Sequence, residues 1–264
     1  RDIDIRMRPL YRFVVTGHKD DTRYALSRQY ENPLISSFEK KLPVGVEVSN
    51  GQKNYSEGQL DSLEAFAWAS DAPSAEEYFL RALHAYGERQ FNPSLEYYGD
   101  AVRMASSETG VEALYESFYL MNRGALRAEM IEFISSIESN VQVLSMDDAG
   151  NARARVKDQV VHRYDYSDAV EDMERAREML PDVPYFHYNL GSLYSLSDEH
   201  IKSIESYTRA IDLYPYMGDA YYNRGLVLIY LKDKEKGCID LSRAGELGVH
   251  DAYSAIKRFC EDGD

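Results

Sequence analysis

The sequence predicts a mainly α-helical solenoid built from helical hairpins, and two observations lead to that prediction. The stretch Tyr188-Asn189-Leu190-Gly191 returns as Tyr222-Asn223-Arg224-Gly225, a shift of 34 residues. Apolar residues also recur at helical spacing on both sides of each glycine. A fixed period of this length indicates a repeat architecture, in which each unit buries its apolar face against its neighbours.

The two best units cover residues 184–217 and 218–251, with Gly191 and Gly225 at the eighth position of each. Each unit is expected to be a pair of helices that approach closely where the facing residues are small. Pro181 and Pro215 are expected to stop second helices, because proline cannot continue the helical hydrogen-bond ladder. Both glycines are therefore predicted to be close-approach positions.

Weaker matches extend the array in both directions from residue 61 to residue 264. Units are expected at 75–108 and 150–183, and an atypical unit at 109–149, where Phe118 stands at a position that should be small. An apolar stripe near the end predicts a capping helix at 252–261, which would cover the last open face of the solenoid.

Residues 1–60 are predicted to be a separate, strand-containing extension. They carry 10 Lys and Arg against 8 Asp and Glu, whereas the rest of the chain carries 20 against 37. The extension is also rich in β-formers, as in Phe13-Val14-Val15. The composition therefore changes near residue 60.

The charge and the motifs exclude several classes of function. A net charge of −15 disfavours nucleic acid and anionic membrane surfaces as partners. No apolar run approaches the roughly 20 residues that span a bilayer. No phosphate-binding loop, nucleophile elbow or zinc-protease motif is present, so we expect no enzyme, no cofactor and no metal site.

In the 34-residue units described above, the chain resembles the tetratricopeptide repeat (TPR) family, and the resemblance covers roughly two thirds of its length. The resemblance implies a right-handed superhelix of helical hairpins and a scaffold without catalytic activity. Some members of the family clamp the carboxylate at the end of a peptide with Lys, Asn and Arg. Asn189 and Asn223 fill the Asn position here, but Asp219 stands where such a Lys would be, so this clamp is not expected.

More narrowly, residues 240–248 and 252–259 resemble the C-terminal end of large exported multi-repeat proteins of gut anaerobes. Those proteins carry a strand-rich insert before their last repeats, which Met7-Arg8-Pro9-Leu10-Tyr11 resembles. The resemblance implies further repeats upstream of Arg1 and an extracytoplasmic location, in the periplasm or at the cell surface.

The predicted functional site is the concave groove formed by the first helices of successive units. Tyr and Asn side chains suit recognition, since a rigid ring gives contact area at low entropic cost and an amide pairs with a peptide backbone. The acidic edge of the groove favours a neutral or basic protein or peptide partner. Two alternatives remain open: a glycan-binding surface and a structural spacer. The predicted groove residues are Tyr185, Tyr188, Asn189, Ser192, Asp219, Tyr222, Asn223 and Leu226.

The two cysteines, Cys238 and Cys260, are too few for a disulfide scaffold and too far apart for a metal knuckle. They are predicted to be buried small apolar residues, with a disulfide between them as the alternative for an exported protein.

Overall fold

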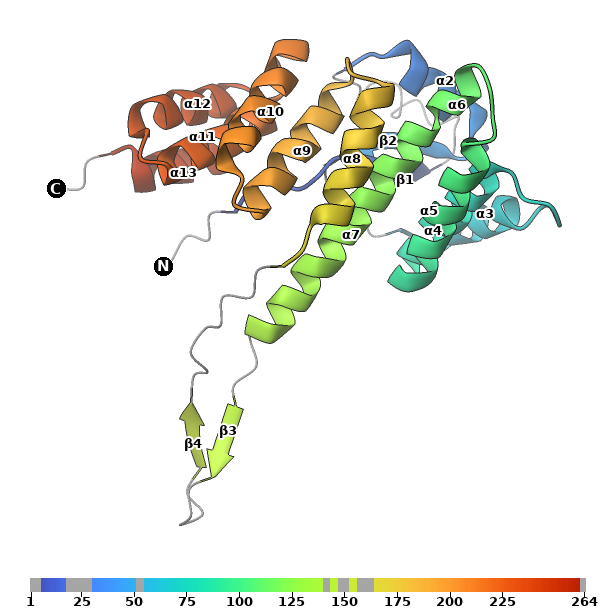
Figure 1. Cartoon of the computed structure of the whole chain (residues 1–264), viewed down its shortest axis with the longest axis horizontal. Helices are drawn as coiled ribbons and strands as arrows, with labels where there is room; N and C mark the ends of the chain where they lie inside the picture. Colours follow the sequence, from blue (N-terminus) through green and yellow to red (C-terminus); the bar gives the residue numbers. More distant parts are fainter. Residues whose placement is uncertain are drawn as a thin grey trace.

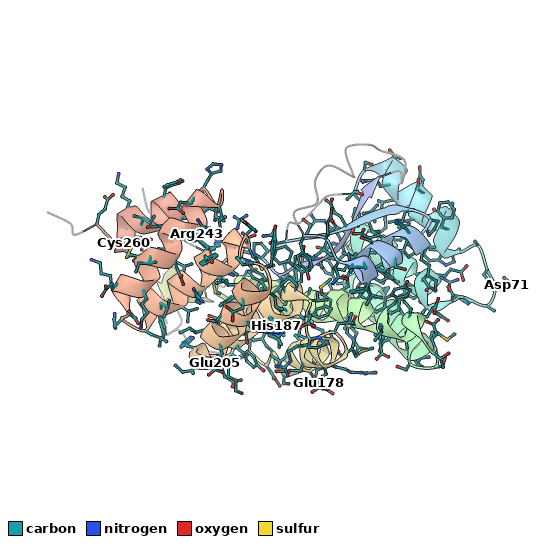
Figure 2. The ribbon with its side chains drawn as sticks, turned by 90° about the horizontal axis from the view of Figure 1, so that it is seen from above. Asp71, Glu178, His187, Glu205, Arg243 and Cys260 are labelled. Carbon is teal, nitrogen blue, oxygen red and sulfur yellow. A yellow bond between two sulfur atoms is a disulfide. The ribbon has the colours of Figure 1, made fainter. Side chains whose placement is uncertain are left out.

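The computed structural model describes residues 6–17, 30–50, 55–139, 143–146, 152–155 and 164–261. Over these residues the chain is a TPR-type α-solenoid with a small two-stranded antiparallel sheet in its N-terminal part. Figure 1 shows the helices standing side by side in a row. Figure 2, seen from above, follows the row from Asp71 at one end, past His187, to Cys260 at the other. None of the helices in these residues is long and apolar enough to cross a membrane.

Three helical hairpins and a final helix lie in the predicted repeat ranges. The first pairs α4 (Ala75–Gly87) with α5 (Phe91–Ala105), and α3 (Glu57–Ala67) packs against α4. Near the other end, α9 (Pro184–Leu196) pairs with α10 (His200–Leu213), and α11 (Gly218–Tyr230) pairs with α12 (Lys234–Glu246). The last helix, α13 (Asp251–Phe259), packs on α12 and covers the end of the array.

The glycines at the eighth position lie where the two helices of a hairpin meet. A Cβ atom on Gly191 would stand 2.7 Å from the ring of Tyr207, and one on Gly225 would stand 2.9 Å from the backbone oxygen of Gly237. Real Cβ atoms do not approach other heavy atoms this closely. The prediction that both are close-approach positions is confirmed.

The middle of the array differs from the expected pair of units at 109–149 and 150–183. After a short α6 (Val111–Leu114), one continuous helix, α7 (Glu116–Ser139), replaces the two expected helices. Its hairpin partner is α8 (Ser167–Met179), so a single repeat spans both ranges. Strands β3 (Val143–Met146) and β4 (Ala152–Arg155) lie between the two helices in sequence and pair away from the array (Figure 1).

The register of this repeat is set by Asn122-Arg123-Gly124, which matches Asn223-Arg224-Gly225. A Cβ on Gly124 would stand 3.1 Å from the backbone oxygen of Ala169 on α8, so Gly124 is the close-approach glycine of this hairpin. The small position is therefore Gly124 and not Phe118, which is fully buried in the core. The 34-residue period fails here because an insertion separates the two helices of the unit.

The N-terminal part folds against the array. Strand β1 (Arg12–Gly17) pairs antiparallel with β2 (Gly45–Ser49), and α2 (Pro33–Lys41) lies between the two strands in sequence. Phe13 on β1 lies with its ring centroid 5.1 Å from that of Phe38 on α2 and 5.2 Å from that of Phe118 on α7. The core is therefore shared between this part and the helices.

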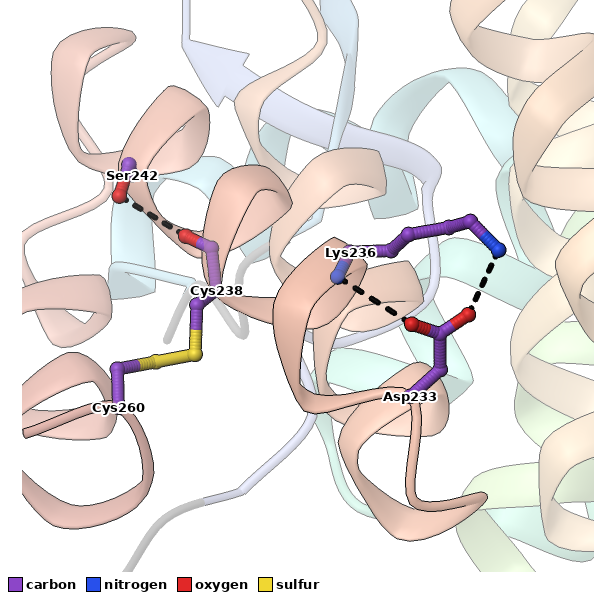
Figure 3. Close-up of a disulfide and its surroundings, with 5 residues drawn as sticks. All are labelled: Asp233, Lys236, Cys238, Ser242 and Cys260. Atoms are coloured by element: carbon purple, nitrogen blue, oxygen red, sulfur yellow. Dashed lines mark hydrogen bonds and ion pairs between the residues drawn. A yellow bond between two sulfur atoms is a disulfide. The ribbon is translucent and has the colours of Figure 1, made fainter. Parts of the chain in front are cut away.

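The cysteines are half-buried and joined by a disulfide, so the prediction of two buried free thiols is wrong. The bond links Cys238 on α12 to Cys260 at the end of α13 (Figure 3). The capping helix turns back along α12 and brings the two Cα atoms to 5.8 Å, a separation that a disulfide spans. Their places in the last unit and in its capping helix allow this proximity, but a separation of 22 residues does not by itself predict it.

Candidate functional site: an occupied concave groove

The concave groove of the array holds an extended piece of the same chain, residues 7–13, which we call the groove segment. In Figure 1 it is the dark blue trace that passes behind α9 toward β1. Its C-terminal end lies at α7 and its N-terminal end at α11. The groove segment therefore runs in the direction opposite to the order of the repeats.

Two neighbouring repeats hold this segment by its main chain. Asn223 on α11 accepts a hydrogen bond from the backbone N–H of Arg8 (2.7 Å) and donates one to its carbonyl oxygen (3.2 Å). Asn189 on α9 does the same at Tyr11, with distances of 2.7 and 2.8 Å. Both asparagines occupy the sixth position of their units and are fully buried.

The corresponding residue of the interrupted repeat continues the pattern. Asn122 on α7 accepts from the backbone N–H of Phe13 at 2.8 Å and donates to its carbonyl at 3.0 Å. A primary amide carries an acceptor and a donor side by side, so it pairs with one residue of an extended chain as a neighbouring β-strand would. Three successive first helices thus present the same main-chain contact.

The side chain of Arg8 meets the acidic edge of the groove. Its Nε donates to Asp219 Oδ1 on α11 at 2.8 Å, and its Nη1 donates to Asp251 Oδ2 on α13 at 2.8 Å. The Asp219 side chain is 17% exposed and that of Asp251 is 64% exposed, so the contact to Asp219 is the better shielded from solvent.

The side chain of Tyr11 lies among groove tyrosines. Its ring centroid is 4.8 Å from that of Tyr185 and 4.9 Å from that of Tyr188, the second pair edge to face. Its hydroxyl donates to Asp219 Oδ2 at 2.8 Å. Burial, followed by the charge of Asp219, raises the pKa of Tyr11 well above its ordinary value. The phenol therefore remains a donor.

Tyr188 contributes its hydroxyl and its ring to the groove. The hydroxyl reaches the carbonyl oxygens of Arg8 at 2.9 Å and Pro9 at 3.0 Å. Burial raises the pKa of Tyr188 well above its usual range, with Asp219 as the next cause. The hydroxyl also accepts a hydrogen bond from Asn223 at 2.9 Å, which orients that amide.

The eight predicted groove residues fall into two groups. The five that contact the groove segment are Tyr185, Tyr188, Asn189, Asp219 and Asn223.

The remaining three serve the helices. Ser192 hydrogen-bonds the hydroxyl of Tyr207 on α10 at 2.8 Å. Tyr222 is 1% exposed and lies in the apolar cluster of α11, α12 and α13, against which Leu226 packs. Tyr188, which was predicted in the groove, is fully buried beneath the groove segment, whereas Tyr222 is buried among the last three helices.

Sequence reasoning missed Asn122, Asp251 and the groove segment itself. The motif Asn122-Arg123-Gly124 was a visible signal, since it repeats residues 223–225, but its spacing to Gly191 is not a multiple of the period. Nothing in the sequence indicated that Arg8 would meet Asp251, 243 residues away.

A cavity of about 560 Å³ opens beside Arg8 and Tyr11, bounded by β2, by the start of α11 and by the loop before α13. Asp219 lies at its edge, where it also accepts a hydrogen bond from Asn50 Nδ2 at 2.8 Å. Within the described ranges, no group of three or more His, Cys, Asp or Glu side chains is placed to hold a metal ion.

Comparison with known proteins agrees with this repeat geometry. The model of the "Tetratricopeptide repeat" family matches residues 184–216, the hairpin of α9 and α10. Those residues form a tetratricopeptide repeat.

Two curated relatives share short stretches. A "UDP-N-acetylglucosamine--peptide N-acetylglucosaminyltransferase" of Giardia intestinalis is 32% identical over 79 residues, which is 30% of this chain and 5% of that protein. The "Photosystem I assembly protein Ycf3" of Cuscuta gronovii is 34% identical over 68 residues, or 25% of this chain and 40% of that protein. This chain therefore spans well under half of either relative.

Among solved structures, "MamA 41-end from Desulfovibrio magneticus RS-1" is similar with a TM-score of 0.49. The alignment has 14% identity and covers 72% of this chain and 84% of that one.

Proposed function

We propose that this chain is a non-catalytic protein-interaction scaffold whose concave groove binds an extended peptide segment. The supporting observation is the paired hydrogen bonding of Asn189 and Asn223 to the main chain of one residue each. Every peptide bond offers a carbonyl, and every residue other than proline offers the N–H that this contact uses. The groove segment is the chain's own occupant of this site.

The chemistry of the groove supports a neutral or basic peptide. Asp219 and Asp251 meet the one cationic side chain of the groove segment that points to this edge. An acidic peptide would place like charges together and leave buried polar groups unpaired, which costs free energy.

The glycan alternative has less support. Asn189 and Asn223 each pair with the N–H and the C=O of one residue, a contact that a sugar does not offer, and Tyr222 is 1% exposed among the last helices. A purely structural spacer remains the other outcome of the experiment below.

A capture experiment tests the proposal. The immobilised chain is presented to an extract of the source cell and, separately, to a glycan array. We expect protein capture, no glycan binding, and loss of capture in an Asn189→Ala/Asn223→Ala variant. Arg103→Ala, an exposed change on α5 away from the groove, is the matched control and should capture normally. Capture that survives the asparagine changes, or binding to glycans only, would contradict the proposal.

An extracytoplasmic location is also proposed here. The disulfide between Cys238 and Cys260 supports it, because disulfides persist in oxidising compartments and are rare in the cytosol. Alkylation of thiols in intact source cells before lysis tests this proposal. Two alkylated cysteines in the protein at its native location would contradict it.

A further inference from the structure

The contacts of Arg8 and Tyr11 carry information about which peptide the groove accepts. The asparagine contacts are made to main-chain atoms and so do not depend on the side chains of the peptide. By contrast, the two carboxylates and the tyrosine rings contact side chains, and they do so at two positions three residues apart.

We propose that the groove selects a segment of a partner protein with Arg three residues before Tyr, and that residues 7–11 compete for the same place. This inference rests on the proposed function and names the partner's chemistry. Asp219 links the two positions, because one of its oxygens accepts from Arg8 Nε and the other from Tyr11 Oη. Without the Arg, Asp219 Oδ1 loses this donor, and without the Tyr, Oδ2 keeps only the hydrogen bond from Asn50 Nδ2.

Arginine suits this site better than lysine. Asp219 and Asp251 lie on different helices, α11 and α13, and the guanidinium reaches them through two different nitrogens. A single ammonium group on a flexible stem does not offer this fork. The residue after the Arg needs no N–H, since the chain's own segment has Pro9 there and the hydroxyl of Tyr188 reaches its carbonyl.

The two ends of the groove segment differ in how they are held, which makes exchange of the N-terminal end feasible. Phe13 is fully buried in the shared core and belongs to β1. Pro9 is exposed and the Arg8 side chain is 35% exposed. A competing segment therefore takes over the contacts at residues 8 and 11 while β1 stays paired with β2.

The test uses the full chain, with substitutions in the groove segment that weaken its hold on the groove. An Arg8→Pro/Tyr11→Pro variant removes both N–H groups that the asparagines hold and both side chains at the acidic edge. The probe is a fluorescein-labelled pentapeptide, Met-Arg-Pro-Leu-Tyr, which matches residues 7–11. Two matched probes carry Glu in place of the Arg or Ala in place of the Tyr. Binding is measured by fluorescence anisotropy.

We expect the opened variant to bind the parent probe at least about tenfold more tightly than the unaltered chain does, and each changed probe at least about tenfold more weakly than the parent. Equal binding of all three probes would overturn the selection rule while leaving the proposed function intact. No binding of any probe up to about 1 mM would overturn both. A dimer of the variant that excludes the probe would instead assign the groove to a second copy of the chain.

If the double proline variant does not fold, Arg8→Ala serves in its place. It removes only a half-exposed side chain and leaves Asp219 and Asp251 to the arginine of the probe. The expected result is the same order of affinities, and equal affinity for the parent and Glu probes contradicts the inference. Circular dichroism of each variant confirms that helical content is retained.

Discussion

His187 illustrates how one buried residue makes stability depend on pH. Its Nε2 lies 2.7 Å from the backbone oxygen of Pro181, and burial lowers the pKa of His187 below its ordinary value of 6.5. The unfolded chain therefore takes up a proton at a higher pH than the folded chain does. The contribution of His187 to the free energy of unfolding is fully present above pH 6.5 and is lost as the pH drops toward the lowered pKa of the folded state.

A His187→Gln substitution should flatten this dependence, since the amide can donate to the same carbonyl without titrating. Urea unfolding at several pH values between 7 and 5 measures it. Between pH 7 and pH 5 we expect a smaller loss of unfolding free energy in the variant than in the parent chain. An identical loss in both would show that His187 does not contribute.

A second prediction concerns the close-approach glycine Gly191. In Gly191→Ala the new methyl group would stand 2.7 Å from the Tyr207 ring, so we expect a loss of about 1–3 kcal/mol. In the control, Gly58→Ala on the exposed face of α3, the methyl group meets nothing within 4 Å. Alanine favours helix over glycine, so the control should be neutral or slightly stabilised. Thermal unfolding of both variants measures these effects. Equal stability of Gly191→Ala and Gly58→Ala would place Gly191 outside the contact between the two helices.

Among the elements, the capping helix α13 depends most on a covalent link. The disulfide joins it to α12 across 22 residues, and closing a loop of this length stabilises a fold by about 3 kcal/mol. Figure 3 shows the link together with the hydrogen bond from Ser242 Oγ to the carbonyl of Cys238. The N-terminal residue of α13, Asp251, is also a partner of Arg8.

Cys238→Ser/Cys260→Ser should therefore lower the unfolding free energy by about 3 kcal/mol. A reductant should lower the unfolding free energy of the parent chain and leave that of the double-serine variant unchanged. Denaturant titrations with and without reductant measure both effects. Intact mass after alkylation without reduction should show no modified thiol. Two alkylated thiols in the native protein would rule the link out.

The elements also show what sequence periodicity can and cannot reveal. The hairpins of α9–α10 and α11–α12 follow from the return of Tyr-Asn-x-Gly at a fixed period, because the close contact of two helices demands a small residue at one place. The pairing of α7 with α8 could not follow from that period, since the intervening insertion displaces Gly124 from register. The disulfide likewise depends on how the last helix turns, which no local pattern encodes.

For the whole molecule, the change of composition near residue 60 does not mark independent parts. Phe13 and Phe38 share one core with Phe118, and the groove segment lies along three repeats. Five of the eight predicted groove residues contact the groove segment of the same chain, and their binding of a partner stays a prediction. The groove segment belongs to the same chain, and its contacts with Asn189 and Asn223 join residues at least 178 positions apart. A single sequence does not reveal contacts between residues so far apart.

The acidic array and the basic groove segment also complement each other across the molecule. The array beyond residue 60 has an excess of carboxylates, and two of them meet Arg8. Under the proposed function, a partner that takes the place of the groove segment would have to supply the same charge.

Site-resolved amide hydrogen exchange of Arg8, Tyr11 and Phe13 tests the central claim, that asparagines of successive repeats hold an extended main chain in the groove. We predict that all three amides are protected in the native protein. Asn189→Ala should speed exchange at Tyr11 by about tenfold or more, the effect of losing about 1.4 kcal/mol of hydrogen bonding, while Phe13 stays protected. Exchange of Arg8 and Tyr11 at the rate of a free peptide in the unaltered chain would contradict the account.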